Sequence, residues 1–376
     1  AGAHHSAHSW HIRLTMYEDK IEFSLEKDIL KSLRLPPLLV GETPVEQKKN
    51  WETKRQWYTQ QMQDTIYGEV PEERGIVSVG KIESRSLPEG FGLSSGENIY
   101  LIVSVNGIDE TVPMWLVLPD VSEPSPVVII HGENNLDGLN DLCRVLVPNG
   151  VAVAVYDRTS LRPNVDRKEG AMYRLFPEWD GGSLAAWSWG MMRCIDYLAN
   201  RSDIDETKIA VAGHSQCGKA TMITSVLDER VAMAIPLCSG CAGTALLNYY
   251  GYNCETLKDL TLRDRWHYWL KPKAHRYSRG REVLLPFDMH TIRAMMAPRL
   301  VLSIDGVADH WANPAGTKLG FIASQDIYTL YGIEDRNRAI FREGGHSLSS
   351  VDALLMRDFM TEHGFINSAG AQDHEL

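Results

Sequence analysis

The chain lacks long hydrophobic runs and runs of basic residues. Its longest apolar stretches, such as PVVII and VAVAV, are far too short to cross a bilayer, so no membrane partner is expected. The 376 residues carry a formal net charge of -11. Because an acidic chain repels phosphate backbones, the composition also argues against nucleic-acid partners.

The chain also lacks two CxxC pairs, the cysteine spacing that is typical of zinc sites. The six cysteines are Cys143, Cys194, Cys217, Cys238, Cys241 and Cys254. Cys238 and Cys241 have this spacing, but no second CxxC pair accompanies them, so we expect no zinc site. No cofactor is expected either. Cys241 and Cys254 bracket a loop and are candidates for a disulfide, which the sequence alone does not decide.

Two regions differ in their hydrophobic pattern. Residues 1–75 read as an N-terminal extension that ends in a helix, VEQKKNWETKRQWYTQQMQDTIYG, before the break at Pro71. Residues 76–376 read as a single catalytic domain, which opens with the alternating runs GIVSVGKIESRSL and NIYLIVSVNG. This alternation predicts antiparallel strands at the start of a sheet.

Further along, continuous apolar strands alternate with helical patterns. PVVIIHG, GVAVAVYD, KIAVAG and VAMAIPLCSG are typical of strands buried on both faces, and helix-like segments separate them. The alternation predicts an α/β fold with a mostly parallel central sheet. Residues 244–285 break the rhythm, and we interpret them as an insertion over the carboxyl edge of the sheet, where α/β proteins bind ligands.

The stretch VAGHSQCGKA predicts a nucleophile elbow centred on Ser215. Such an elbow is a sharp turn between a strand and a helix, and it requires small residues on both sides of the serine. Gly213 meets this requirement before the serine, and Cys217 and Gly218 meet it after the serine. The alternative is that Ser215 merely caps the helix.

A serine hydrolase of this kind needs an acid and then a histidine later in the chain. Asp305 and Asp309 follow a late strand in RLVLSIDGVADHWANP, and His346 lies in the glycine-rich loop FREGGHSLSS. The chain order predicts a triad of Ser215, one of the two aspartates, and His346.

Several motifs in the same order resemble the glucuronoyl esterases, carbohydrate esterase family fifteen, and especially their bacterial branch. They are RQWYTQQMQDTIYGEVP, LAAWSWGMMRCIDYL, VAGHSQCGKA, DERVAMAIPLCSG, PFDMHTIRAMMAPRLVL, DHWANP and GGHS. The resemblance implies an α/β-hydrolase three-layer sandwich with antiparallel N-terminal strands. It also implies a metal-free serine esterase, secreted or periplasmic, that cleaves esters between lignin alcohols and the glucuronic acid of xylan.

The resemblance assigns roles to individual residues. Ser215 matches the nucleophile, His346 the histidine, and Asp309 the later of two acid positions, the earlier of which reads Cys238 here. The substrate-binding positions that it implies are Lys219, Trp311, Glu255 and Gln216. Gln216 departs from the family, which usually has an arginine after the nucleophile to stabilise the oxyanion.

The sequence therefore predicts a serine carboxylesterase acting on a carbohydrate-linked ester, with a 4-O-methyl-glucuronoyl ester of the xylan–lignin type as the leading substrate. Because fold does not fix substrate, acetyl, feruloyl or other small esters remain the first alternative. The second alternative is a catalytically impaired relative that only binds carbohydrate, since Gln216 and Cys238 depart from the family pattern.

Overall fold

The computed structural model of the protein describes residues 20–87, 94–132 and 140–367. The chain divides into two compact units, the first ending at Arg34 and the second spanning residues 35–376. The first unit contains α1 (Lys20–Ser32). The sequence places the domain boundary after residue 75, whereas α2 (Pro44–Met62) already packs within the second unit, because it buries Trp51, Tyr58 and Met62 in a core cluster there.

The described part of the second unit contains a nine-stranded sheet in the order β1-β2-β3-β5-β4-β6-β7-β8-β9. The strands are β1 (Ile76–Arg85), β2 (Ser95–Val105), β3 (Ile108–Leu118), β4 (Ser125–Gly132), β5 (Ala152–Asp157), β6 (Ile204–His214), β7 (Val231–Leu237), β8 (Leu300–Gly306) and β9 (Asn337–Arg342). The pairings among β1, β2, β3 and β5 are antiparallel, and all pairings from β5 through β4 to β9 are parallel.

Burial along the strands follows the hydrophobic pattern of the sequence. In β2, buried residues such as Ile99, Leu101 and Val103 alternate with less buried neighbours. In β4 and β7, nearly every residue is buried, because the parallel part of the sheet is covered on both faces. The predicted fold class, an α/β-hydrolase type with a mostly parallel sheet and antiparallel N-terminal strands, is confirmed.

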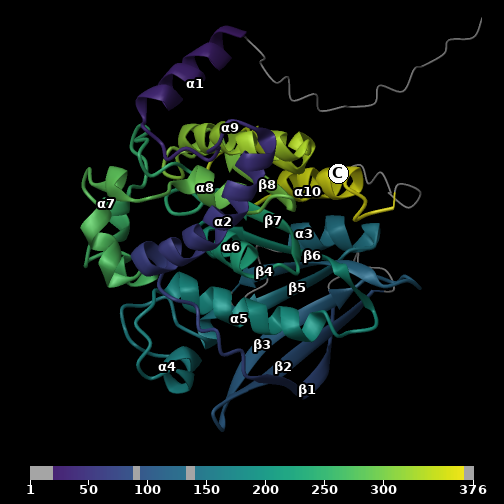
Figure 1. Cartoon of the computed structure of the whole chain (residues 1–376). Coiled ribbons are helices and arrows are strands. Elements are labelled where there is room, and N and C mark those ends of the chain that lie inside the picture. The colour runs from purple at the N-terminus through teal and green to yellow at the C-terminus, as the bar shows by residue number, and fades with distance from the viewer. Residues whose placement is uncertain (1–19, 88–93, 133–139, 368–376) are drawn as a thin grey trace, which may run out of the picture. The chain divides into compact units, whose positions relative to one another are not determined.

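Helices cover both faces of the sheet. Besides α2, the described helices of the second unit are α3 (Asn140–Leu146), α4 (Ala171–Leu175), α5 (Ser183–Leu198), α6 (Gln216–Leu227), α7 (Leu257–Leu260), α8 (Met289–Ala294), α9 (Pro314–Tyr331) and α10 (Ser350–Glu362). Residues of α3 and α10 share one core cluster with one face of the sheet. Residues of α5, together with α2, α6, α8 and α9, pack in the clusters on the opposite face (Figure 1). The result is a three-layer arrangement in which the sheet lies between two layers of helices.

The segment between β7 and β8 is the longest connection of the parallel sheet. It contains α7, α8 and short 3-10 turns at His267–Trp269, Pro272–Tyr277 and Glu282–Leu284. Cys241 and Cys254, the candidates for a disulfide, both lie in this segment, and both are free thiols in the structure. Among the described helices, none is long and apolar enough to cross a membrane.

Candidate active site

Ser215 lies in a strained turn between β6 and α6. Its φ of 59° and ψ of -125° are unusual for a residue with a side chain, and strain of this kind often marks functional sites. The backbone is held in place by a hydrogen bond from the Ser215 amide to the Leu237 carbonyl, at 2.9 Å. The Ser215 side chain makes no capping hydrogen bond to α6, which removes the support for a purely structural capping role.

Two glycines make this turn sterically feasible. A Cβ atom on Gly213 would lie 2.4 Å from the Cys217 carbonyl oxygen, and one on Gly218 would lie 2.7 Å from the Ser239 Cβ. Contacts this short do not occur in folded proteins, so neither position accepts a larger residue without backbone movement. Gly218, three residues after the serine, therefore permits the close approach of α6 to the ends of β6 and β7.

The carboxyl ends of β6, β7, β8 and β9 bring the remaining polar groups to the same edge of the sheet. His346 follows β9, and its Nδ1 lies 2.6 Å from Asp309 Oδ2, in the loop after β8. The second carboxylate oxygen of Asp309 accepts a hydrogen bond from the Ala312 amide at 3.2 Å. Burial alone would raise the pKa of Asp309, but these hydrogen bonds from His346 and Ala312 hold its pKa below the ordinary value.

The structure separates the two candidate acids. Asp305 lies within β8, is completely buried, and has no hydrogen-bond partner on either carboxylate oxygen among the described residues. Burial raises the pKa of Asp305 to about 7, although the charge of Arg293 opposes this. Asp309 alone of the two reaches His346, so the geometry favours Asp309 as the acid that orients the imidazole.

His214 and Cys238 flank His346 at this edge. The rings of His214 and His346 have their centroids 4.6 Å apart, which places His346 beside the residue that precedes Ser215. Among the described hydrogen bonds, none joins Ser215 Oγ to His346, and in structures without substrate such contacts are often long. Cys238 directly follows the end of β7, and its side chain is buried at this edge.

One group of side chains at this edge has the composition of a metal site. The potential ligand atoms of His214, Cys238 and His346 all lie within 4.8 Å of one another, and two imidazoles and a thiolate suit Zn²⁺. Burial lowers the pKa of His214 to about 4, which keeps that imidazole neutral. Burial also raises the pKa of the Cys238 thiol to about 12, however, and this disfavours the thiolate that a metal requires.

Lys219 and Glu255 form a buried ion pair close to the serine. Lys219 is 2% exposed, and its Nζ donates to Glu255 Oε2 at 2.5 Å and to the carbonyls of Ser239 and Cys241, each at 2.7 Å. An ammonium group has three N–H donors, so these three acceptors occupy all of them. Lys219 therefore fixes Glu255 and the loop after β7, and its contact with sugar hydroxyls stays a prediction.

Trp311 and Gln216 complete the set of predicted substrate-binding residues. The Trp311 carbonyl accepts a hydrogen bond from the Glu255 amide at 2.8 Å, so the backbone of one candidate residue positions another. The partly exposed Trp311 ring lies edge-on to Trp266, with the ring centroids 6.1 Å apart. Gln216 is the first residue of α6 and is also partly exposed.

His214, which directly precedes Ser215, is not among the residues that the sequence predicts for the site. The structure shows that its ring packs against His346 and that its Nε2 is buried without a hydrogen-bond partner among the described residues. The signal was available in the sequence, because a residue at the carboxyl end of β6 and one in the loop after β9 face the same edge. The arrangement as a whole can activate a hydroxyl nucleophile and is chemically suited to acyl transfer.

Comparison with known proteins gives a consistent result. A family model described as "Glucuronyl esterase, fungi" matches residues 101–332. A "4-O-methyl-glucuronoyl methylesterase 1" of Wolfiporia cocos is 27% identical over 330 residues, which are 84% of this chain and 76% of that protein. "Carbohydrate esterase MZ0003", from an unknown prokaryotic organism, is 36% identical over 152 residues, which are 40% of this chain and 34% of that protein.

Solved structures show the same relationship. A glucuronoyl esterase from Caldicellulosiruptor kristjansonii aligns with a TM-score of 0.70 and 25% identity, covering 87% of this chain and 90% of that one. A glucuronoyl esterase from Solibacter usitatus aligns with a TM-score of 0.75 and 22% identity, covering 86% and 96% of the two chains. The second likeness by itself supports the fold alone.

Proposed function

This chain belongs to the glucuronoyl esterase family, and from that premise we propose that it hydrolyses a glucuronoyl ester, with a 4-O-methyl-glucuronoyl ester of the xylan–lignin type as its substrate. The observation that carries the proposal is the hydrogen bond between His346 and Asp309, located at the same sheet edge as the strained Ser215. A polymeric substrate of plant cell walls lies outside the cell, so we expect a secreted or periplasmic enzyme.

The proposed reaction is acyl transfer through a serine ester. The Ser215 hydroxyl attacks the ester carbonyl while the free Nε2 of His346 takes its proton. Asp309 holds the imidazole through Nδ1 and stabilises the charged form. The protonated imidazole then gives its proton to the departing alcohol, and a water molecule activated by the same His346 releases the glucuronic acid and regenerates Ser215.

The oxyanion is stabilised by the start of α6. The first backbone amides of a helix have no carbonyl partner within it, and the helix dipole there favours negative charge. We expect the amide of Gln216 and its side chain to contribute hydrogen bonds to the developing oxyanion. A neutral amide donor is weaker than a charged guanidinium, which makes this site less suited to strong oxyanion stabilisation than one with arginine.

Gln216 also supports a second candidate, an esterase of the same fold that prefers acetyl, feruloyl or other small esters. Arginine at this position can engage sugar oxygens as well as the oxyanion, and its loss relaxes the demand for a uronic acid. Under this alternative the same Ser215, Asp309 and His346 carry out the same chemistry on a different acyl group.

A hydrolysis panel separates these functions. We would measure kcat/KM on methyl and benzyl glucuronates and on acetyl and feruloyl esters, with Ser215→Ala as the control for background hydrolysis. In parallel, a fluorophosphonate probe should label wild-type protein at Ser215 and leave Ser215→Ala unlabelled. Preference for the glucuronates supports the proposal, and preference for acetyl or feruloyl esters supports the alternative. Absence of both labelling and hydrolysis in the folded protein contradicts both esterase functions.

A further inference from the structure

A cleft of 810 Å³ lies between residues 162–181 and residues 261–279, outside the residues assigned to catalysis. We call it the basic cleft. Its charged lining consists of Arg162, Arg167, Lys168, Arg263, Lys271 and Arg279, against Asp166, Asp180 and Asp264. This excess of positive charge is notable because the chain as a whole carries a formal net charge of -11.

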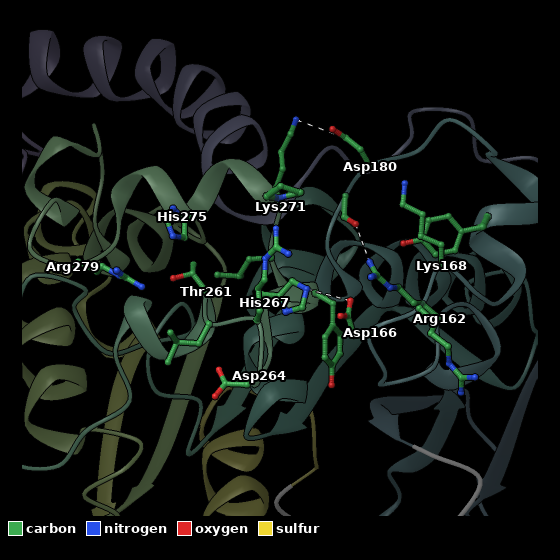
Figure 2. Close-up of a pocket in the computed structure, with 18 residues that line it drawn as sticks. Arg162, Asp166, Lys168, Asp180, Thr261, Asp264, His267, Lys271, His275 and Arg279 are labelled. Carbon is green, nitrogen blue, oxygen red and sulfur yellow. Dashed lines mark hydrogen bonds and ion pairs between the residues drawn. The ribbon is translucent and has the colours of Figure 1, made fainter.

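Several of these cations have no carboxylate partner. Asp166 lies 3.2 Å from His267 and Asp180 lies 3.9 Å from Lys271, and both pairs are marked by dashed lines in Figure 2. Within the described residues, no carboxylate lies within ion-pair distance of Arg162, Arg263 or Arg279. Six cationic side chains therefore face only three acids in the lining of the cleft, which keeps an excess of positive charge.

Arg162 is a buried cation in the wall of the cleft. It is 5% exposed, its Nη1 donates to the Gly181 carbonyl at 3.0 Å, and its Nε is buried without a hydrogen-bond partner in the described structure. A buried guanidinium with an unused donor has a desolvation cost that an anionic ligand would offset. Figure 2 shows Arg279 on one side of the cleft and Arg162 and Lys168 on the other, so a bound anion would be approached from both sides.

The basic cleft adjoins the candidate sugar site through aromatic side chains. The guanidinium carbon of Arg265 lies 5.5 Å from the ring centroids of both Trp266 and Trp311. His267, the next residue after Trp266, lines the cleft. An oligosaccharide held against Trp311 would therefore extend past Trp266 to the edge of the cleft.

We propose that the basic cleft binds the free carboxylate of an unesterified uronic acid on the same oligosaccharide whose esterified uronic acid is cleaved at Ser215. The inference rests on the proposed function and specifies the substrate as an acidic polysaccharide. The ester itself is uncharged and requires no cation, whereas a neighbouring free uronate carries a full negative charge. Arginine suits this ligand, because its planar donors match the two oxygens of a carboxylate.

The test compares three substrates: a small benzyl glucuronate, an oligosaccharide carrying one ester and free uronic acids, and the same oligosaccharide with its free carboxyls reduced to alcohols. The variant is the double substitution Arg263→Gln with Arg279→Gln, in which both side chains are exposed and removable without disturbing the core. Arg276→Gln is the matched control, because Arg276 is an exposed arginine of the same segment that does not line the cleft.

We expect the double variant to raise KM on the charged oligosaccharide about tenfold, which corresponds to about 1.4 kcal/mol of binding. KM on the benzyl ester and on the reduced oligosaccharide should stay within about twofold of wild type, and Arg276→Gln should change none of the three. Raising the salt concentration should weaken only the charged substrate's binding to wild type.

Two results would overturn the inference while leaving the proposed function intact: equal KM for the charged and reduced oligosaccharides in wild type, or no loss in the double variant. Loss of hydrolysis on all three substrates by wild-type enzyme would instead contradict the proposed function. As a second readout, calorimetric titration of Ser215→Ala with an unesterified acidic oligosaccharide should show binding that weakens when Arg263→Gln and Arg279→Gln are added.

Discussion

The candidate active site and the basic cleft use charge in opposite ways. At the active site, Asp309 is bonded to His346 and Lys219 to Glu255, so the charged groups are buried and satisfied within the chain. In the cleft, cations such as Arg263 and Arg279 are exposed and unpaired among the described residues. The difference teaches that a reacting centre requires fixed geometry, whereas a surface that recognises a polymer requires accessible charge.

The strongest test of this contrast is Asp309→Asn. We expect turnover to fall by about 10⁴-fold with the fold intact, because the amide no longer orients the imidazole or stabilises its charged form. The measurement is kcat on a benzyl glucuronate, with circular dichroism as the check on folding. Asp305→Asn serves as the control and should retain turnover within a few-fold of wild type; the reverse pattern would reassign the acid to Asp305.

The buried ion pair should matter mainly for stability. Lys219→Met removes one partner and leaves Glu255 buried without a compensating charge, so the free energy of unfolding should drop by about 3–5 kcal/mol. Urea unfolding measures this, and Lys258→Met is the control, because Lys258 is exposed in the same connection. A drop of similar size in both variants would contradict the assignment of the effect to the buried pair.

The oxyanion position is expected to give a smaller effect. Gln216→Arg introduces a charged donor beside the expected position of the carbonyl oxygen, where one donor is worth about 3 kcal/mol in a known serine protease. We expect the ratio of kcat/KM for glucuronate over acetyl esters to rise about tenfold. A flat ratio, or one that moves toward acetyl esters, would show that Gln216 belongs to a site with a different specificity.

The remaining prediction concerns Asp305 and pH. Its pKa is about 7 in the folded protein, above its ordinary value of 3.8, because burial disfavours the charged form. The folded state therefore holds the proton more tightly, and the stability contributed by Asp305 is fully present below pH 4 and is lost as the pH rises through 7. The loss amounts to about 1.4 kcal/mol per pH unit over this window.

Asp305→Asn should remove this pH-dependent contribution. Relative to wild type, the free energy of unfolding of the variant should improve between pH 5 and pH 8, as measured by urea unfolding at each pH. An unchanged difference between the two proteins at both pH values would show that Asp305 is charged in the folded state and that a partner compensates it.

Much of the fold and part of the candidate site follow from local sequence. Continuous apolar strands can only be buried on both faces, which produces the parallel sheet and its carboxyl edge. Gly213 and Gly218 permit the turn at Ser215 because both positions face atoms closer than any Cβ allows. The family motifs likewise identified the glucuronoyl esterase family correctly.

Only the tertiary structure decided which acid faces His346 and which charged side chains pair, because these contacts join residues far apart in the chain. Asp305 and Asp309 are the same residue type four positions apart, but Asp305 lies inside β8 while Asp309 lies in the loop beyond it, facing His346. Lys219 lies in the first turn of α6, where the sequence alone is compatible with an exposed side chain. In the folded chain it is buried and paired with Glu255, which is far away in sequence.

The basic cleft is the clearest case of this limit. Its two walls, residues 162–181 and residues 261–279, are separated in sequence by the strands β6 and β7. Neither segment on its own contains a run of basic residues. Their positive charges gather only when the segments meet on the folded surface. Local pattern thus determined which elements form and where a strained serine can stand, whereas packing determined which charges become partners and which remain available to a ligand.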